Sequence, residues 1–196
     1  MDGVELSDEE LCRRVAARVP GAFDALVDRY QERAYRIAWS VVRDREDARD
    51  CSQEAFVRLH DAAGSFAGQA KFSTWFFRIL VNCCLDHQRR RRGWRRLISR
   101  EGTVRELDSA RDDRIERVAA PLDDPVDRLE AEQQTRRLWE AVGDLSPQQR
   151  AVVMLQAREG LPTGEIAAVL GLSEATVRVH MHRAVTALRK RLRSVP

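Results

Sequence analysis

The sequence is poor in the features that build membrane-spanning, secreted or large catalytic proteins. Only 6% of its 196 residues are aromatic while 33% are charged, and this balance suits small, well-solvated helical units better than the extensive core of a catalytic barrel. No apolar run approaches the roughly 20 residues that a membrane-spanning helix needs. The first ten residues are acidic, whereas a secretion signal begins with basic residues. We therefore predict a cytoplasmic protein without membrane insertion.

Cysteine is scarce as well, and its spacing does not resemble a secreted disulfide scaffold. We expect four free thiols, at Cys12, Cys51, Cys83 and Cys84. Cys83 and His87 stand four residues apart, so on a helix they would share one face, with Cys51 or His60 as possible further zinc ligands. Two ligands do not make a site, and we predict no metal and no other cofactor. A redox or metal role of Cys83, Cys84 or His87 stays open at this point.

Residues arranged for catalysis are missing too. The sequence shows neither a Ser/His/Asp arrangement nor a glycine loop that could hold a phosphate group. We therefore predict that the protein is not an enzyme and has no catalytic residues.

The net charge of +3 conceals an uneven distribution along the chain. Residues 1–70 carry 10 basic and 14 acidic side chains, whereas residues 71–107 carry 10 and 3. Residues 108–132 are acidic again, with 4 basic and 9 acidic side chains, and residues 146–196 are basic, with 8 and 3. Two basic blocks separated by an acidic one suggest two separate contacts with a polyanion.

Helical periodicity dominates the first half of the chain. Apolar residues recur at steps of three and four through residues 23–41, 48–59 and 72–83, which predicts three amphipathic helices. Ser7, followed three residues later by a glutamate, has the spacing of a capping box and opens a short helix before them. Such helices bury their apolar stripes only against each other. We therefore predict an all-α fold in which residues 7–95 form a first helical bundle.

The second half contains another small helical unit. Residues 96–125 lack periodicity and contain many aspartates and two prolines, which predicts a flexible acidic linker. Residues 126–196 then form a second, four-helix domain. Its first helix has an apolar stripe over residues 126–142, and Ser146 followed by Pro147 supplies an N-cap and a proline in the first turn of the next helix.

The spacing within residues 163–190 is that of a helix-turn-helix motif. Small Ala167 allows two helices to approach, Gly171 permits a left-handed turn, Ser173 caps the second helix, and Val177 packs it on the first. Arginines on the second helix could read guanine in the major groove. The alternative is a helical hairpin with a solvated basic face. The exposed face would carry Thr176, Arg178, Val179, His182 and Arg183.

The other basic block ends a predicted helix. Four consecutive arginines occupy residues 89–92, and phosphate groups would neutralise them. The alternative is a solvated, self-repelling helix end. Aromatic residues precede the run, and basic groups beside aromatic rings suit single-stranded nucleic acid. Most of these rings are expected in the core, and Phe66, in a loop flanked by glycines, is the one predicted to be exposed for an unstacked base.

These segments resemble, in this order along the chain, the extracytoplasmic-function (ECF) group of bacterial RNA polymerase sigma factors. Residues 44–56, DREDARDCSQEAF, look like the polymerase-binding segment of that family. Residues 72–82, FSTWFFRILVN, and 86–90, DHQRR, look like its promoter-melting and minus-ten helix. Its minus-thirty-five domain is resembled by five short segments of the second half: residues 145–150, 160–161, 165–167, 170–173 and 176–184.

The resemblance implies roles for particular residues. Four would dock on the coiled coil of the largest polymerase subunit, namely Asp47, Asp50, Gln53 and Glu54. The minus-ten contacts would come from Phe66, Lys71, Trp75, Asn82, Arg89, Arg90, Arg91 and Arg92. The base-facing helix would use Thr176, Arg178, Val179, His182 and Arg183. The resemblance also implies an anti-sigma partner that masks these surfaces.

We therefore expect a protein that binds core RNA polymerase and directs promoter-specific initiation, reading duplex DNA at minus thirty-five and capturing an unpaired base at minus ten. The alternative is a helix-turn-helix regulator that acts without being a polymerase subunit. Promoter preference, regulon, anti-sigma partner and the relative orientation of the two domains do not follow from the sequence.

Overall fold

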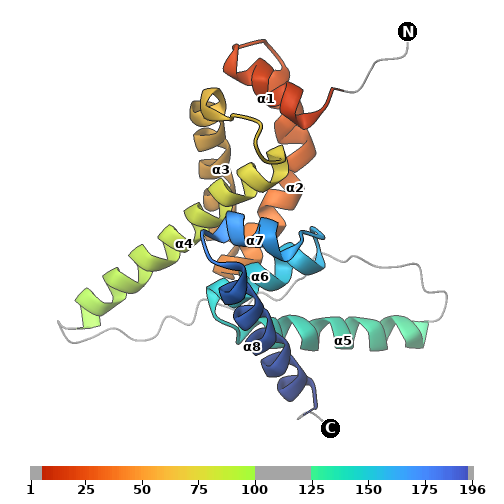
Figure 1. Cartoon of the computed structure of the whole chain (residues 1–196). Helices are drawn as coiled ribbons and strands as arrows, with labels where there is room; N and C mark the ends of the chain where they lie inside the picture. Colours follow the sequence, from red (N-terminus) through yellow and green to blue (C-terminus); the bar gives the residue numbers. More distant parts are fainter. Residues whose placement is uncertain (1–5, 100–124, 194–196) are drawn as a thin grey trace.

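The structure, a computed structural model, describes the backbone of residues 6–99 and 125–193, with side chains over 6–91 and 133–193. Over these ranges it contains α-helices, one short 3-10 turn and no strand (Figure 1), so the predicted all-α fold is confirmed. The elements are α1 (Asp8–Ala16), α2 (Ala22–Val42), α3 (Arg45–Ala62), η1 (Ala63–Ser65), α4 (Phe72–Ser99), α5 (Pro125–Gly143), α6 (Pro147–Ala157), α7 (Thr163–Leu170) and α8 (Glu174–Arg193).

Helices α1 to α4 form the N-terminal bundle, and its helix ends follow the predicted caps. Ser7 Oγ accepts a hydrogen bond from the Glu10 backbone N–H at 3.2 Å, and Asp44 accepts from the backbone N–H groups of Glu46 and Asp47 at the start of α3. Each cap satisfies donors that the first helical turn leaves without a partner. Helices α2, α3 and α4 pack on one another along their apolar stripes.

The start of α4 is held by the core and by α1. Phe72, Phe76 and Phe77 are fully buried, and the Tyr30 ring of α2 meets all three edge-on, at centroid distances of 5.2 to 6.1 Å. A carboxylate of α1 completes the helix end, because Glu9 Oε1 accepts from the Phe72 backbone N–H at 3.0 Å and so stabilises the positive end of the α4 dipole. The aromatic segment is thus a core element, and its buried rings fix the position of α4.

Helices α5 to α8 form the C-terminal unit. The Ser146 capping box is complete, since Ser146 Oγ accepts from the Gln149 N–H and the Gln149 side chain accepts from the Ser146 N–H. Helix α5 extends away from the remainder of the molecule (Figure 1). Its predicted apolar stripe is only partly correct, because Leu138 is 43% exposed while Val142 is buried. Near Leu138, the Trp139 ring packs against Trp39 of α2 at a centroid distance of 5.4 Å, so α5 contacts the rest of the molecule only partly along the predicted stripe.

The two units lie against each other and share one continuous hydrophobic core. Helix α6 packs on α2, and α7 packs on α4 (Figure 1). The orientation that the sequence left open is therefore a closed one. Helix α4 continues to Ser99, beyond the predicted bundle end at residue 95, and most of the predicted linker, residues 100–124, lies outside the described residues.

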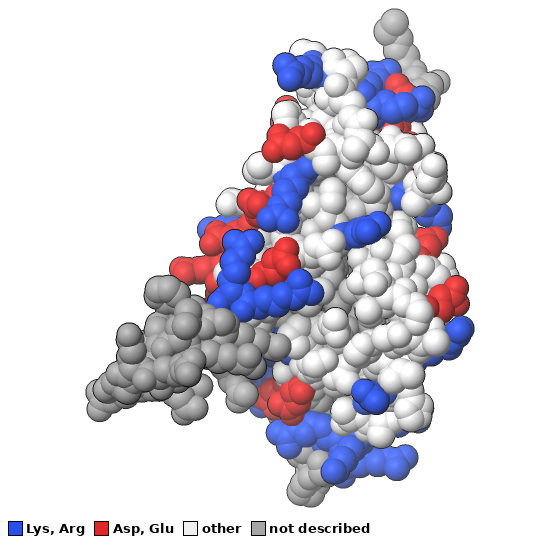
Figure 2. Space-filling model, turned by 60° about the vertical axis from the view of Figure 1, so that its left-hand side comes forward, with Lys and Arg blue, Asp and Glu red and all other residues white. Residues whose placement is uncertain are grey.

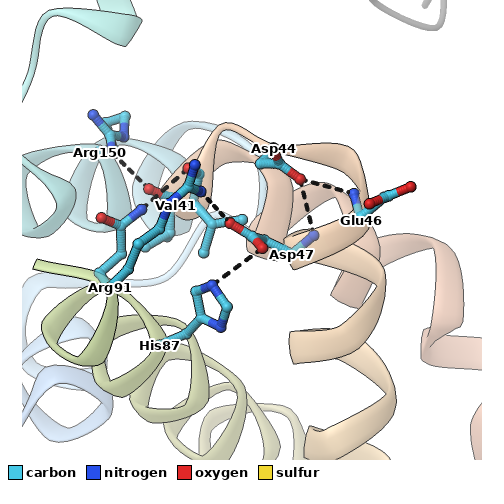
Figure 3. A network of polar contacts seen from close by, with 9 residues as sticks. Val41, Asp44, Glu46, Asp47, His87, Arg91 and Arg150 are labelled. Atoms are coloured by element: carbon cyan, nitrogen blue, oxygen red, sulfur yellow. Dashed lines mark hydrogen bonds and ion pairs between the residues drawn. The ribbon is translucent and has the colours of Figure 1, made fainter. Parts of the chain in front are cut away.

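Polar contacts secure this closed arrangement across the interface. The Arg150 guanidinium of α6 donates to the Val41 carbonyl oxygen near the end of α2 at 2.6 Å, where both groups are buried (Figure 3). Arg33 of α2 donates to Glu159 Oε2 through Nε at 2.9 Å and also through Nη2. Since cations favour the carbonyl end of a helix, Arg150 joins the C-terminal unit to the N-terminal bundle at a favourable point.

Candidate polymerase and promoter interfaces

The outer face of α3 is the first candidate interface. Its inner face is buried through Ala48, Cys51, Ala55 and Leu59, so the opposite face points to solvent. Three of the four residues predicted to bind polymerase lie on that outer face and are exposed: Asp50, Gln53 and Glu54.

Val57 belongs to the same exposed surface and was not predicted from the sequence. Its side chain is 56% exposed, one helical turn beyond Glu54 and two beyond Asp50. It adds an apolar side chain at the end of this acidic and amide surface, and the core of a protein interface is more apolar than its rim. Periodicity could have predicted this exposure, because Val57 is not among the apolar residues that form the buried stripe within residues 48–59.

Asp47, the fourth predicted polymerase contact, is arranged differently. One Asp47 carboxylate oxygen lies 3.2 Å from His87 Nε2 and the other accepts from Arg91, both on α4 (Figure 3). The Asp47 side chain is 20% exposed. The structure therefore brings Asp47 to the junction of α3 and α4 and not to the outer face with the other three residues.

The loop before α4 holds the predicted stacking ring. Phe66 is half-buried, with its ring centroid 5.2 Å from Trp75 and 6.0 Å from Phe72. The expectation of a freely exposed Phe66 ring was therefore wrong, because packing on Trp75 and Phe72 removes apolar area from water. Trp75 is half-buried too. The two rings together form a partly exposed aromatic surface beside Lys71.

The arginine run is only partly available to a phosphate backbone. Arg90 is exposed, and so is Asn82, which lies about two turns earlier on α4. Arg89 is exposed and pairs with Asp86 at 3.0 Å. Arg91 is engaged with Asp47, which corrects the expectation of a fully free run, and the Arg92 side chain lies outside the described residues. Charges of both signs alternate near this part of the surface in Figure 2.

The helix-turn-helix has the predicted geometry. Gly171 adopts the left-handed conformation with φ of 64° between α7 and α8, and Ser173 Oγ accepts from the Thr176 N–H at 3.2 Å. Ala167 and Val177 are buried where the helices meet. Thr176 is half-buried and bonded to Ser173, whereas the remaining predicted recognition residues are exposed along α8: Arg178, Val179, His182 and Arg183.

Basic side chains also gather in the last turn of α8. Lys190, Arg191 and Arg193 lie there, and Figure 2 shows basic groups at this end of the molecule. Cations near the C-terminus complement the helix dipole. The same charges extend the basic face of the recognition helix for backbone phosphates.

All four cysteines lie in the described part of the chain and are buried free thiols, as predicted. Burial raises the pKa of Cys12 to about 11, with Glu9 adding to the rise, and burial likewise raises the pKa of Cys83 to about 11. Since the thiolate is the metal ligand and nucleophile, these two groups are held in an inert form. Within the described residues, His, Cys, Asp and Glu side chains form no group of three suited to a metal.

Within the same ranges, no helix has both the length and the apolar content that crossing a membrane requires.

Comparison with known proteins agrees with this arrangement. The family described as "Sigma-70 region 2" matches residues 26–95, which cover most of α2, all of α3 and most of α4. The family described as "Sigma-70, region 4" matches residues 135–188, which include the helix-turn-helix. The chain is 34% identical over 186 residues to the "ECF RNA polymerase sigma factor SigM" of Mycobacterium tuberculosis, covering 92% of this chain and 82% of that protein.

The chain therefore belongs to the ECF RNA polymerase sigma factors, which bind core RNA polymerase and direct initiation at specific promoters. It is also 26% identical to the ECF factor SigW of Bacillus subtilis, over 98% of this chain and all of that protein. Among solved structures, CnrH in complex with the cytosolic domain of CnrY superposes with a TM-score of 0.64 at 25% identity, covering 96% of this chain and 99% of CnrH. RpoE of Bartonella quintana, in complex with the anti-sigma factor NepR, has the same fold, with a TM-score of 0.66 at 20% identity and coverage of 89% and 98%.

Proposed function

We propose that the two helical units divide the work of promoter recognition. Helix α8 reads the minus-thirty-five element in duplex DNA, and α4 with the loop before it captures the minus-ten element after strand separation. The observation that supports this proposal is that the two exposed candidate surfaces lie on different units. Base-facing candidates on α8 are exposed, and Asn82 and Arg90 are exposed on α4.

For the minus-thirty-five element, α8 would insert its first turns into the major groove. Arg178 and Arg183 extend from the free face of the helix, and an arginine can bond two acceptors of guanine at once, which discriminates by about 1 to 3 kcal/mol against another base. His182 and Val179 lie between them. The basic last turn of α8 contacts phosphates and sets position without reading sequence.

For the minus-ten element, the chemistry must suit an unpaired strand. The half-buried rings of Phe66 and Trp75 offer partial faces for a base, and stacking on an aromatic ring contributes about 1 to 3 kcal/mol per base. Asn82 has the amide donors and acceptor needed to read a base edge. Arg89, Arg90 and Arg92 follow the backbone in this proposal, and Arg91 joins them only after leaving Asp47.

Polymerase docking belongs to the outer face of α3. Asp50, Gln53, Glu54 and the apolar Val57 form a surface suited to a basic partner with an apolar pocket. The closed arrangement leaves these residues exposed, so the chain can dock on core polymerase before it opens. Asp47 acts at the edge of this surface, where a basic group of polymerase competes with Arg91 for its carboxylate.

The closed arrangement cannot contact both promoter elements at once. Their names place the elements about 25 base pairs apart, or about 85 Å at 3.4 Å per step of the duplex. A compact chain of this length has a radius of gyration of only about 16 Å. The units must therefore separate, and the 25 residues of the segment 100–124 can reach at most about 90 Å when extended.

The sigma factor itself performs no bond chemistry in this proposal, because polymerase supplies the catalytic centre, and the two act together in the cytoplasm. We also propose an anti-sigma partner. The solved relative CnrH is in complex with the cytosolic domain of CnrY, and a partner of that kind could stabilise the closed form.

Run-off transcription by reconstituted core polymerase on a randomised promoter library tests the proposal. Asn82→Ala should change base preference only at minus ten, and Arg183→Ala only at minus thirty-five. Asp24→Asn, a charge change at an exposed residue in the first turn of α2 that is in neither set of predicted contacts, serves as the control. Identical preference profiles for all three variants would contradict the division between the units.

A further inference from the structure

A carboxylate of the C-terminal unit lies on the DNA-facing part of the N-terminal bundle. Glu165, in the first turn of α7, accepts a hydrogen bond from Lys71 Nζ at 2.9 Å through Oε1. Through Oε2 it accepts from Thr74 Oγ1 at 2.7 Å. Thr74 is buried at 4% exposure while Lys71 remains exposed. A cation and a hydroxyl from the start of α4 thus converge on the two oxygens of one anion.

This pair of donors has the chemistry of a site for an oxyanion. A lysine binds phosphate as a point charge, and a hydroxyl supplies a directed donor for a second oxygen. The Lys71 and Thr74 contacts lower the pKa of Glu165, in that order of size, so the carboxylate is held in its charged form. The site therefore binds an anion in the closed chain, and that anion is an internal one.

We propose that Lys71 and Thr74 form a binding site for one backbone phosphate of the unpaired minus-ten strand, and that Glu165 occupies this site in the closed chain as a competitor. The assignment rests on the proposed function, since it makes the strand captured by α4 the ligand. The anion site adjoins the ring surface, because Lys71 and Thr74 lie between Phe66 and Trp75 in sequence and the Trp75 N–H donates to the Lys71 carbonyl. A stacked base would then place its phosphate near Lys71.

Opening of the two units is what exchanges one anion for the other. Glu165 moves with α7, which packs on α4 only in the closed arrangement. In that arrangement DNA must displace a carboxylate that is already positioned, whereas in the open chain Lys71 and Thr74 meet the phosphate without competition. The site thus links strand capture to separation of the units.

Fluorescence anisotropy on the full-length chain tests the assignment, with a fluorescein-labelled single-stranded 12-mer of mixed sequence as probe. Glu165→Gln removes the charge of the competing side chain and keeps its size. We expect the 12-mer to bind about fivefold more tightly. This is the effect of one hydrogen bond to a charged group, reduced because Lys71 is exposed to solvent. One more phosphate contact should steepen the plot of log K against log salt by about 0.7 for a single strand. Glu32→Gln is the matched control, because Glu32 is an exposed carboxylate that pairs with Arg36 within α2.

Further changes identify the ligand group. In the Glu165→Gln background, Thr74→Val and Lys71→Ala should each remove most of the gain, and a 12-mer with uncharged methylphosphonate linkages should show none. A Glu165→Gln chain that binds no tighter than Glu32→Gln overturns the assignment, as does an equal gain with the uncharged 12-mer. If Glu165→Gln fails to fold, the double variant Lys71→Glu, Glu165→Lys replaces it. This variant keeps an ion pair between the two positions but puts a carboxylate where the phosphate would bind. The 12-mer must then bind it more weakly than it binds the unchanged chain.

These measurements need no polymerase, so they are independent of the transcription assay. If the chain shows the expected binding pattern but gives no run-off product, the result supports the phosphate site and contradicts the proposed role in initiation. If the chain is active in run-off transcription but substitutions at Glu165, Lys71 and Thr74 do not change binding of the 12-mer, only the proposed phosphate site is contradicted.

Discussion

The ion pair between Arg33 and Glu159 offers a quantitative test of the closed arrangement. Glu159 has only 7% of its side chain exposed, whereas Arg33 retains 37%. Arg33 also lies over the Tyr30 and Phe77 rings, 4.9 and 5.1 Å from their centroids. Glu159→Gln keeps the shape of the side chain and leaves Arg33 with a neutral partner. The change should therefore act on the contact between the units and spare the core of each unit.

The size of the effect follows from burial. Removing one partner of a fully buried ion pair costs about 3 to 5 kcal/mol. Water can reach Arg33 and solvate the cation again, so we expect about 1 to 2 kcal/mol here, which shifts the equilibrium between closed and open chains about 5- to 30-fold toward the open form. Asp144→Asn is the control, since Asp144 pairs with Arg191 inside the C-terminal unit and both side chains are more than half exposed.

Single-molecule energy transfer measures this equilibrium directly. Dyes on Asp61→Cys of α3 and Thr186→Cys of α8 report the separation of the units, and the four native thiols are buried. Glu159→Gln should enlarge the low-transfer population, and Arg33→Met combined with it should add little, because both changes break the same pair. Populations equal to those of Asp144→Asn would refute the view that this pair holds the units together.

Three further predictions concern other parts of the chain. Arg183→Ala should abolish discrimination at one minus-thirty-five base pair by about 1 to 3 kcal/mol in a competition binding assay, whereas Arg90→Ala should weaken binding to all promoters and reduce the salt slope by about one phosphate contact. Ser146→Ala should lower the free energy of unfolding by about 1 kcal/mol in a denaturant titration, through loss of the α6 cap. Burial raises the pKa values of Cys12 and Cys83 from 9.0 to about 11. The thiols of the unfolded chain therefore lose their protons at lower pH, and the free energy of unfolding should fall as pH rises from about 9 to 11. Unfolding curves of a chain with both cysteines changed to alanine should lack this part of the fall.

Much of the local structure could be predicted because its causes are local. The Ser146 capping box, the Gly171 turn and the Ser173 cap each depend on residues within a few positions of one another. The buried stripes of α2 to α4 follow from periodicity, since only one face of each helix can meet the core. The recognition face of α8 was predicted for the same reason, as the opposite of the buried face that contains Val177 and Ala184.

The closed arrangement could not be predicted, because its contacts join residues that are far apart and that appear solvated in the sequence. Glu159 and Glu165 are two acidic residues in a basic segment, and nothing near them indicates partners on α2 and directly before α4, 126 and 94 positions away. The partners of Arg91 and the packing of Phe66 are likewise tertiary. Charge patterns predict which side chains are polar, but not which of them find an internal partner.

The chain is closed in isolation and must open to contact two promoter elements. The most direct test is the distance between the same two dyes, on α3 and α8, in the free chain and in a transcriptionally active complex with core polymerase and promoter DNA. We expect a compact distribution in the free chain and an increase of tens of ångströms in the complex, as the spacing of the elements requires. An unchanged compact distribution in a complex that makes full-length transcript would contradict it.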